Sequence, residues 1–480
     1  MDIVALLEIF VKEILAAEEN FLSNPKDFYG LETAVKSSAE SFSAGFLGMV
    51  LTSMNDRLCK DGWRKLKYNI CRHDQRTLLT TVGDVVFKST YFQQREGEKK
   101  YHYLLEDILG LEAHERFSEA AETAILTEAL RTSYEEATRA IPSRSEITKT
   151  TVMNKVHGIA EMIPLRSAPE KKKCKYLFIE ADEDHVSEQH GRWSKGNDGF
   201  ISRLAYIYEY KQDKPKVKGR KELVNTYYFS GLYEGSNGVK GFWEEIQQYI
   251  EQNYDSDELQ HVFISGDGGA WIKSATAYVD RSLYCIDKYH MTKYINKAAN
   301  QMLDEAELAK EKLYRYIYKK QRVRFKAYTE KMLESANNPD PILELQKYAL
   351  GNWSAVIRSY HNKLLSGCSA EGHISHVLSD RLSSRPMGWS QTGADRMSKL
   401  RCYERNHGRE KIINLVRYSR EQRKLKRTGT DDVVVEKINM RELMNAHYDQ
   451  SRAYIDRIQA TMPGLTSKKT ASIRMQLKLL

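Results

Sequence analysis

The sequence predicts an α+β protein of several domains, in which a helical region with a β-hairpin precedes a mixed α/β domain and a basic helical tail. Short β-branched and aromatic runs alternate with amphipathic stretches between residues 176 and 290, which indicates strands and helices in turn. Two of the strand-like runs end in acidic clusters, IEADEDH at 179–185 and ISGDGG at 264–269. Residues 401–480 hold 18 Lys and Arg against 9 Asp and Glu, so this region alone carries an excess equal to the net charge of +9 of the whole chain.

Length and composition set the class of protein. At 480 residues and 41% hydrophobic residues, the chain is long enough for two or three domains with cores of their own. No apolar run approaches the roughly 20 residues that span a bilayer, and the first predicted helix is acidic, unlike a signal peptide. The six cysteines are scattered without a Cys-x-x-Cys pair, as in proteins with reduced thiols. We therefore expect a cytoplasmic protein with no membrane partner.

Residues 1–115 are predicted to form a helical region with a β-hairpin. Apolar residues recur at helix spacing through its first half. The strand-like runs 77–82 and 85–91 follow, and Gly83-Asp84 between them predicts a two-residue turn.

Residues 116–165 are predicted to form three short helices in the rhythm of a helix-turn-helix. Ser133 is expected to cap the second helix. The third helix would then place Lys149, Thr151 and Asn154 near a DNA groove. Any small helical bundle has the same rhythm, so a purely structural role for these helices is the alternative.

The domain predicted at 174–400 has a characteristic order of elements. Three strands come first, followed by helix, strand, helix, strand and a long helix, and the two acidic clusters end the first and the fourth strand. This is the order of the ribonuclease-H-like fold. From about 291 to 365 the sequence is polar and helical without strand signals, which predicts an all-helical insertion. A plain α/β domain with incidental acids is the alternative.

Carboxylates at strand ends indicate divalent-metal chemistry. Two metal ions about 4 Å apart can activate the attacking oxygen and stabilise the leaving one in phosphoryl displacement, and hard oxygen ligands select Mg²⁺ or Mn²⁺. Asp182 and Asp267 are the candidates, with Asp184 as the alternative to Asp182 because both share one face of the strand. A third acid is needed, and on spacing alone Glu371 is no better than Asp380. Ordinary turn residues are the plain alternative for each cluster.

Longer motifs around these acids resemble a known family, the bacterial insertion-sequence transposases of the ISLre type, which are similar to the wider Mutator-like class. The resemblance covers most of the chain, the amino-terminal hairpin included. The motifs that carry it are LFIEADEDHV at 177–186, ISGDGGAWIK at 264–273, DKYH at 287–290, EGHISH at 371–376, SRPMGW at 384–389 and SYEEA at 133–137.

The resemblance implies a DDE-type transposase whose triad is Asp182, Asp267 and Glu371, with the helical insertion between the second aspartate and the glutamate. Related families often show Asp-Gly-Thr where this chain has Glu183-Asp184, so the choice between Asp182 and Asp184 stays open. The resemblance further implies two Mg²⁺ or Mn²⁺ ions and double-stranded DNA as partner, with terminal inverted repeats and a target. Water would attack a phosphodiester at the element's end, and the freed 3′-hydroxyl would attack target DNA. A homo-oligomer is the expected active assembly, in the bacterial cytoplasm at the nucleoid.

Asp287 and His290 match an Asp-x-x-His element that the Mutator-like class places after the second aspartate. At i and i+3 they share one face of a helix start, where they would contact flanking DNA or order the metal site. A capping aspartate beside a surface histidine is the alternative.

Three residues of the SRPMGW region are further candidates for DNA contact. Trp389, near Arg381 and Arg385, would stack on an extruded or single-stranded base at the transposon end. Core packing of the tryptophan is the alternative.

The basic region at 401–480 predicts a phosphate-binding surface, with Arg423 and Lys424 on a helical stretch. A solvated helix face is the alternative. Two other functions stay open: a catalytically silent DNA-binding protein derived from a transposase, and a structure-selective nuclease that cuts without joining strands.

Overall fold

The computed structural model describes residues 3–428 except 98, 113, 190–198, 215–220, 366 and 386. The predicted basic region beyond 428 lies outside the described residues. No helix in the described ranges has the length and hydrophobicity to span a bilayer.

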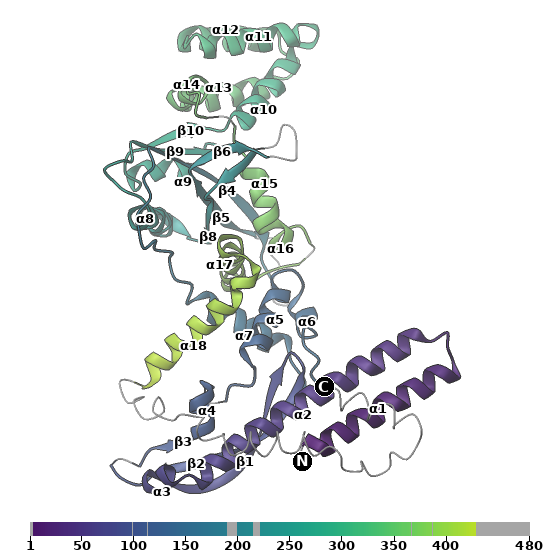
Figure 1. Ribbon diagram of the computed structural model, residues 1–480. Helices are drawn as coiled ribbons and strands as arrows, with labels where there is room; N and C mark the ends of the chain where they lie inside the picture. Colours follow the sequence, from purple (N-terminus) through teal and green to yellow (C-terminus); the bar gives the residue numbers. More distant parts are fainter. Residues whose placement is uncertain are drawn as a thin grey trace. The chain divides into compact units, whose positions relative to one another are not determined.

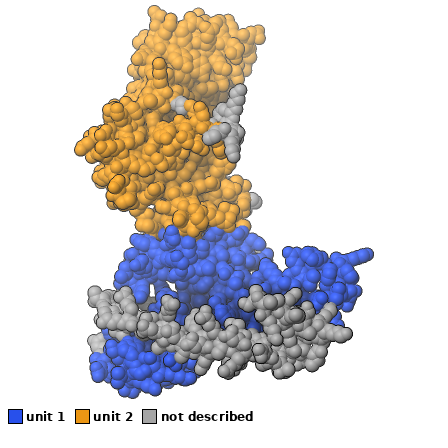
Figure 2. All heavy atoms as spheres, in the orientation of Figure 1, with its two compact units in different colours: residues 1–129, 133–152, 413–480 blue, residues 130–132, 153–412 orange. Residues whose placement is uncertain are grey.

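The chain forms two compact units, coloured separately in Figure 2. The division into units does not fall at the predicted boundary between 1–115 and 116–165, because residues up to 152 belong mostly to the first unit. The predicted tail begins inside the second unit, which extends to Ile412. Of the described residues, the first unit comprises those in 3–129, 133–152 and 413–428, and the second comprises those in 130–132 and 153–412.

The first unit starts with two long helices that pack against each other, followed by a three-stranded antiparallel sheet. Its hydrophobic core lies between the second helix and the sheet, where Leu58, Phe87 and Phe92 are buried. Asp27 caps the second helix by accepting a hydrogen bond from the N–H of Gly30. The elements are α1 (Ile3–Ser23), α2 (Phe28–Lys60), α3 (Gly62–Lys67), β1 (Tyr68–Thr80), β2 (Gly83–Gln94), β3 (Tyr101–His102) and α4 (Leu104–Leu109).

The turn of the predicted hairpin lies two residues earlier than expected. Thr80 pairs with Gly83, so residues 81–82 form the loop and the prediction of a Gly83-Asp84 turn is wrong. Gly83 has φ +115° as the first residue of β2, a conformation that suits glycine. The carboxylate of Asp84 instead accepts hydrogen bonds from the Ser143 hydroxyl and the Ser145 N–H.

The three helices expected between 116 and 165 are present as α5 (Glu119–Ala129), α6 (Tyr134–Ala137) and α7 (Lys149–Ala160). The Ser133 hydroxyl accepts a hydrogen bond from the N–H of Glu136 at 3.0 Å, so the predicted cap is confirmed. The last described helix is α18 (Ile412–Thr428).

A mixed five-stranded sheet is the centre of the second unit (Figure 1). Its strand order is β10-β9-β4-β5-β8, so the first strand of the unit is in the middle. β4 is antiparallel to β5 and parallel to β9, and β9 is parallel to β10. The strands are β4 (Tyr176–Ser187), β5 (Gly199–Tyr208), β8 (Tyr227–Gly231), β9 (His261–Gly266) and β10 (Ser282–Ile286); β6 (Tyr210–Asp213) and β7 (Lys221–Val224) form a separate ribbon.

Alternation along β4 divides the sheet into two faces. Leu177 and Ile179 point into the main core, where they join the apolar face of α8 (Gly235–Asn253) with its buried Trp243. Phe178 packs on the opposite face in a smaller cluster with Tyr208. The larger core therefore lies under α8, and the opposite face of β4 carries Glu180, Asp182 and Asp184.

Helices follow β9 and β10 and form the insertion. Between 291 and 365 the described residues contain helices and turns and no strand. The elements are α9 (Ala270–Lys273), α10 (Lys288–Ala299), α11 (Ala306–Tyr318), α12 (Arg322–Ser335), α13 (Asp340–Gly351) and α14 (Trp353–His361); after the insertion come α15 (Ala370–Ile374), the π-helix η3 (Ser375–Ser379), α16 (Asp380–Leu382) and α17 (Gln391–His407).

Candidate acidic site at the strand ends

Three aspartates lie just beyond the parallel strand pairing of the second unit: Asp182 within β4, Asp267 after β9 and Asp287 after β10. Glu180 of β4 pairs with Ser265 of β9, and Gly266 pairs with Ile286 of β10. Continued by one or two residues, this register places Asp182 and Asp287 on either side of Asp267. Adjacent strands are about 4.8 Å apart, so the carboxylates of Asp182, Asp267 and Asp287 are neighbours. We call these three residues the acidic row.

The pKa of Asp182 reflects its burial and its closeness to the other acids of the row. Burial, with the nearby charge of Asp267, raises the pKa of Asp182 to about 6, although a hydrogen bond from the Glu183 N–H and the nearness of His290 act in the opposite direction. The Asp182 carboxylate accepts this hydrogen bond at 2.9 Å. An acid whose charged form is disfavoured by burial and by a second acid is a site that a cation stabilises.

Glycines shape the turn that carries Asp267. A Cβ at Gly266 would lie 2.6 Å from Ile272 Cδ1, and Gly268 has φ +103°. The Gly269 N–H donates a hydrogen bond to Oδ1 of Asp267 at 2.9 Å. The turn therefore leaves β9 without side chains that would crowd the second acid.

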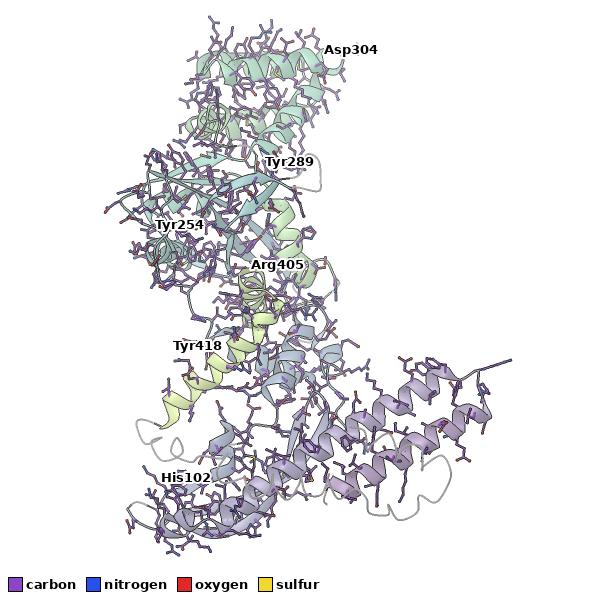
Figure 3. All side chains as sticks on the ribbon, in the orientation of Figure 1. His102, Tyr254, Tyr289, Asp304, Arg405 and Tyr418 are labelled. Carbon is purple, nitrogen blue, oxygen red and sulfur yellow. The ribbon has the colours of Figure 1, made fainter. Side chains whose placement is uncertain are left out.

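Asp287 and His290 lie at the start of α10, beside Tyr289, which Figure 3 labels. Oδ1 of Asp287 accepts a hydrogen bond from the Tyr289 N–H at 2.9 Å, and Oδ2 is 3.9 Å from Nε2 of His290. Burial raises the pKa of Asp287. Asp287 is thus a helix cap, and its position beside Asp267 also makes it part of the acidic row.

Asp184, the alternative first ligand, is engaged by a segment far along the chain. Its Oδ1 accepts hydrogen bonds from the hydroxyls of Ser379 and Ser383, at 3.0 and 2.9 Å. Its Oδ2 is buried without a hydrogen-bond partner among the described residues. Asp182 is thus coupled to Asp267, whereas one oxygen of Asp184 is occupied by hydrogen bonds from Ser379 and Ser383.

The predicted triad is brought together only in part. Glu371 is exposed in the first turn of α15, and α15 packs against β4. Among the residues that the structure describes, no three His, Cys, Asp or Glu side chains are gathered closely enough to hold a metal ion. Asp182 and Asp267 are neighbours, and Glu371 stays outside their immediate group.

The sequence prediction missed Glu180, which is buried beneath α15. Tyr208 and Lys211 donate hydrogen bonds to its Oε1, both at 2.7 Å. Tyr206, together with the N–H and the hydroxyl of Ser369, donates to its Oε2. Burial alone would raise the pKa of Glu180, but the Lys211 charge and these hydrogen bonds outweigh burial and lower it. An ionised carboxylate offers about four lone-pair positions, so Glu180 has no oxygen left for a metal.

In the SRPMGW region, the environment of Trp389 differs from the one predicted for base stacking. Trp389 is 6% exposed and its ring lies under the guanidinium of Arg381, which is 2% exposed, at 4.6 Å. The backbone N–H of Trp389 donates to the carbonyl of Ser187 at 2.9 Å. Stacking of Trp389 on a DNA base is therefore not possible in this structure, because the ring is packed in the core beside β4. Arg385 is exposed.

The DNA-binding candidates of α7 differ in exposure. Lys149 and Asn154 are exposed, whereas Thr151 is half-buried and its hydroxyl is 3.0 Å from that of Thr148. Lys149 and Asn154 keep the accessibility that a DNA contact needs.

Several arginines of α18 bind glutamates within the first unit. Arg423, a predicted DNA contact, forms an ion pair with Glu112 at 2.9 Å. Arg420 pairs with the buried Glu122 at 2.5 Å. Lys424 is exposed. Much of the positive charge of α18 therefore serves the fold.

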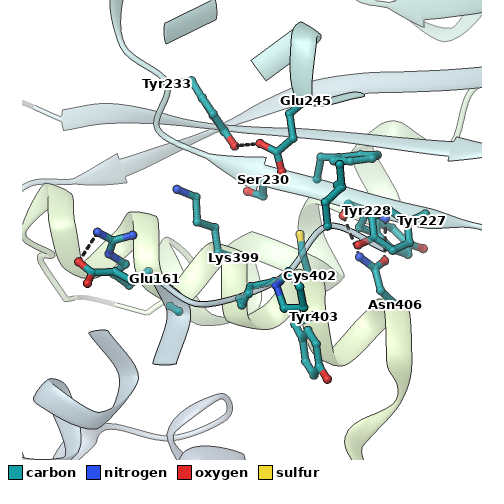
Figure 4. A pocket seen from close by; sticks show the side chains of 16 residues that line it. Glu161, Tyr227, Tyr228, Ser230, Tyr233, Glu245, Lys399, Cys402, Tyr403 and Asn406 are labelled. Atoms are coloured by element: carbon teal, nitrogen blue, oxygen red, sulfur yellow. Dashed lines mark hydrogen bonds and ion pairs between the residues drawn. The ribbon is translucent and has the colours of Figure 1, made fainter. Parts of the chain in front are cut away.

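A cavity of about 180 Å³ lies beside the edge strand β8 of the second unit (Figure 4). Asn406 accepts a hydrogen bond from the N–H of Tyr228 and donates one to its carbonyl, at 2.7 and 2.9 Å. These bonds satisfy part of the free edge of β8. The cavity contains none of the predicted site residues.

The fold and the acids define a chain whose second unit has a mixed sheet with neighbouring aspartates just beyond its parallel strand pairing. The chain belongs to the uncharacterised protein family UPF0236, whose model matches residues 22–419. Three UPF0236 proteins of Caldanaerobacter subterraneus subsp. tengcongensis are each 31% identical to it over 454 residues, which are 91% of this chain and 92%, 88% and 92% of theirs. Among solved structures, the chain is similar to the Drosophila P element transposase strand transfer complex, with 8% identity, a TM-score of 0.23, and coverage of 76% of this chain and 92% of that one.

Proposed function

We propose that this protein is a DDE-type DNA transposase of an insertion sequence. The observation that carries the proposal is the pair Asp182 and Asp267 on adjacent parallel strands, just beyond the last paired residues, with the pKa of Asp182 raised to about 6 by burial and by its neighbour. Catalytic acids of metal-dependent phosphoryl transfer need this closeness.

The topology supports the ribonuclease-H-like assignment. The first strand is central, antiparallel to the second strand and parallel to the fourth. Asp267 follows the fourth strand, as the order of elements in the sequence predicts, whereas Asp182 lies within the first strand, just beyond its parallel pairing with the fourth. The helical segment 288–361 separates the second aspartate from α15, as expected for an insertion before the third acid.

The donor atoms suit magnesium or manganese. Asp182 and Asp267 would hold the ions through carboxylate oxygens, and Glu371 would complete the set when its side chain turns towards them. Two bound ions would supply charge neutralisation at the attacked phosphate and at its leaving oxygen. A bound cation would offset the burial and the neighbouring charge of Asp267 that raise the pKa of Asp182 to about 6.

Double-stranded DNA is the proposed partner, with terminal inverted repeats and a target, bound by a homo-oligomer. The exposed side chains of Lys149, Asn154, Arg385 and Lys424 are available to phosphates. One Caldanaerobacter relative has eleven locus designations in its name, and a gene present at several loci is the pattern that a mobile element leaves.

The test is Mg²⁺-dependent cleavage of DNA that carries the cognate terminal inverted repeats. We expect Asp267→Asn to abolish cleavage and to keep repeat binding. The control is Asp280→Asn, an exposed acid of the same unit that is 3.2 Å from the Gln247 amide, and it should cut normally. Full activity of Asp267→Asn would overturn the proposal.

The same assay separates the two other functions. Cleavage without joined product would indicate a structure-selective nuclease. Repeat binding that needs no Mg²⁺, with no cleavage by the wild-type protein, would indicate a silent DNA-binding protein.

A further inference from the structure

An open groove of about 610 Å³ lies on the helical insertion of the second unit, between α10, α11 and α14 (Figure 1). Each of these three helices packs against the other two. Tyrosines and cations make up most of the lining, namely Tyr314, Tyr318, Tyr360, Lys288 and Arg315. The groove therefore combines aromatic rings with positive charge, outside the acidic site described above.

The three tyrosines form one aromatic cluster. Tyr314 and Tyr318 are one turn apart on α11, so they share a face of that helix. The Tyr360 ring of α14 contacts both, with 6.2 and 5.6 Å between ring centroids. The Tyr314 hydroxyl donates a hydrogen bond to that of Thr292 at 3.0 Å. Tyr318 is 58% exposed, so its ring offers a surface on which a planar ligand can stack.

His361 fixes the backbone that carries this exposed ring. Its Nδ1 lies 3.0 Å from the Ile357 carbonyl and its Nε2 lies 3.0 Å from the Tyr318 carbonyl. The imidazole therefore joins the end of α14 to the end of α11. A ligand that stacks on Tyr318 meets a backbone that is already ordered, which lowers the entropy cost of binding.

Lys288 supplies the positive charge of the groove. Its Nζ is 5.8 Å from the centroid of the Tyr360 ring and donates a hydrogen bond to the Leu365 carbonyl at 2.7 Å. An ammonium has three donors, so a phosphate oxygen can accept another of them. Glu311, which also lines the groove, pairs with Arg315 at 3.1 Å. Two cations and one acid thus leave the lining positive.

The composition of the whole insertion agrees with an anionic, aromatic ligand. Residues 288–363 contain 15 Lys and Arg against 8 Asp and Glu, and 8 of the 29 tyrosines of the chain. Aromatic rings that stack on bases, together with cations that follow the backbone, are the usual means of holding a single nucleic-acid strand. In a duplex the bases already stack on each other and must be flipped out to reach such a ring. The groove therefore suits a single strand.

Two distances show that one short stretch of strand can reach both groups. The Tyr318 ring and the Lys288 ammonium lie 5.6 and 5.8 Å from the same Tyr360 ring. A volume of about 610 Å³ is also within the usual range of ligand sites, about 300–1,000 Å³. Lys288 directly follows Asp287 of the acidic row in the chain. A strand held here therefore passes close to the acidic row.

We propose that this groove is a binding site for single-stranded DNA, in which one base stacks on Tyr318 and an adjacent phosphate contacts Lys288. The choice of DNA as the nucleic acid rests on the proposed function. The binding itself needs no metal ion and no cleavage. The site gives the protein a place for an unpaired strand beside its acids, which the buried Trp389 does not offer.

The first experiment measures binding of a fluorescein-labelled oligothymidylate to the full chain in EDTA by fluorescence anisotropy. Tyr318→Ala should weaken binding by about 5- to 150-fold, the loss that follows removal of one base-stacking ring. Tyr318→Phe keeps the ring and should bind as the wild type does. The matched control is Tyr210→Ala, which removes a tyrosine of the same unit that is 51% exposed on β6, and it should also bind normally. Wild-type affinity in Tyr318→Ala would overturn the inference.

The salt dependence of the same binding tests Lys288. The slope of log K against log salt concentration should fall by about 0.7 in Lys288→Gln, the contribution of one phosphate contact on a single strand. Lys288→Arg keeps the charge and should keep the slope. A slope that is the same in Lys288→Gln as in the wild type would contradict the phosphate contact.

Crosslinking locates the strand directly. An oligothymidylate with one 5-iododeoxyuridine, irradiated in complex with the wild-type protein, should form an adduct in the peptide that contains Tyr318. Adducts found solely outside residues 288–363 would overturn the site. Tighter binding of an RNA strand or of a duplex of the same length would overturn the assignment to single-stranded DNA.

These measurements separate this site from the proposed function, because they are made without divalent metal. A protein that binds the strand through Tyr318 but does not cut repeat DNA in Mg²⁺ would keep the groove and contradict the transposase. A protein that cuts repeat DNA while Tyr318→Ala binds the strand normally would do the reverse.

Discussion

Trp271 donates its indole N–H to Oε2 of Glu183 at 2.7 Å. This hydrogen bond joins β4, which carries Asp182, to the helix that directly follows the turn with Asp267. Glu183 lies on the face of β4 opposite Glu180, Asp182 and Asp184. The hydrogen bond therefore stabilises the strand that carries Asp182 from its other face. The Trp271 ring also stacks on Trp243 of the main core.

Trp271→Phe tests this support. The change keeps an aromatic ring but removes the hydrogen bond to a charged group, which contributes about 1.5–3 kcal/mol. We expect a lower free energy of unfolding in urea and weaker Mg²⁺ binding. Glu183→Gln, which keeps an acceptor for the indole, should have a smaller effect. A Trp271→Phe protein with wild-type values in both measurements would show that the hydrogen bond is dispensable.

Asp182→Asn should stabilise the metal-free protein at neutral pH. The pKa of Asp182 is about 6 in the fold, above the ordinary value of 3.8. The folded state therefore binds the proton more tightly than the unfolded chain, so the wild-type protein loses stability as the pH rises from about 4 to about 6. Thermal melts should show the variant above the wild type at pH 7.5, with a smaller difference at pH 5. A variant that melts lower at pH 7.5 would contradict the assignment.

Magnesium should raise the melting temperature of the wild-type protein. Ligand at 100 times its Kd stabilises a folded protein by about 2.7 kcal/mol. This gain should be absent in Asp182→Asn and Asp267→Asn, and present in Asp184→Asn, whose side-chain oxygen still accepts from Ser379 and Ser383. The opposite result, a loss in Asp184→Asn alone, would identify Asp184 as the first ligand.

Arg420→Met should destabilise the first unit by about 3–5 kcal/mol, because it removes the 2.5 Å ion pair with the buried carboxylate of Glu122. The double change with Glu122→Leu should recover most of the loss. Arg417→Met is the matched control, since its ion pair with Glu119 is exposed and worth little. Urea unfolding measures all three. An unchanged Arg420→Met protein would mean that α18 does not depend on this ion pair.

Local patterns in the sequence were enough to predict much of the sheet. The prediction of a strand at Ser282–Ile286 is confirmed, because its apolar run and its flanking residues are neighbours in the chain. Asp182 and Asp267 could be found for the same reason, because each directly follows an apolar run that is visible by itself, although β4 continues past Asp182 to Ser187. The hairpin turn was misplaced because a glycine that favours a turn can also begin a strand.

The contacts around the acids could not be predicted, because they join residues far apart in the chain. Ser383 and Asp184 are separated by 199 residues, and Ser369 and Glu180 by 189. A glutamate inside an apolar strand indicates a buried carboxylate that needs a partner, and this pattern could have identified Glu180. No local pattern could identify Lys211 as its partner. Trp389 was ambiguous for the same reason, since burial depends on which distant strand covers the ring.

The hydrogen bonds from Ser379 and Ser383 to Asp184 also have a consequence for the order of folding. On the ribosome, β4 is complete nearly 200 residues before Ser383 is added to the chain. At about 5–20 residues per second, this interval lasts roughly 10–40 s. Glu180 can be bonded early by Tyr208 and Lys211, whereas Asp184 receives its two hydroxyl donors only late in synthesis.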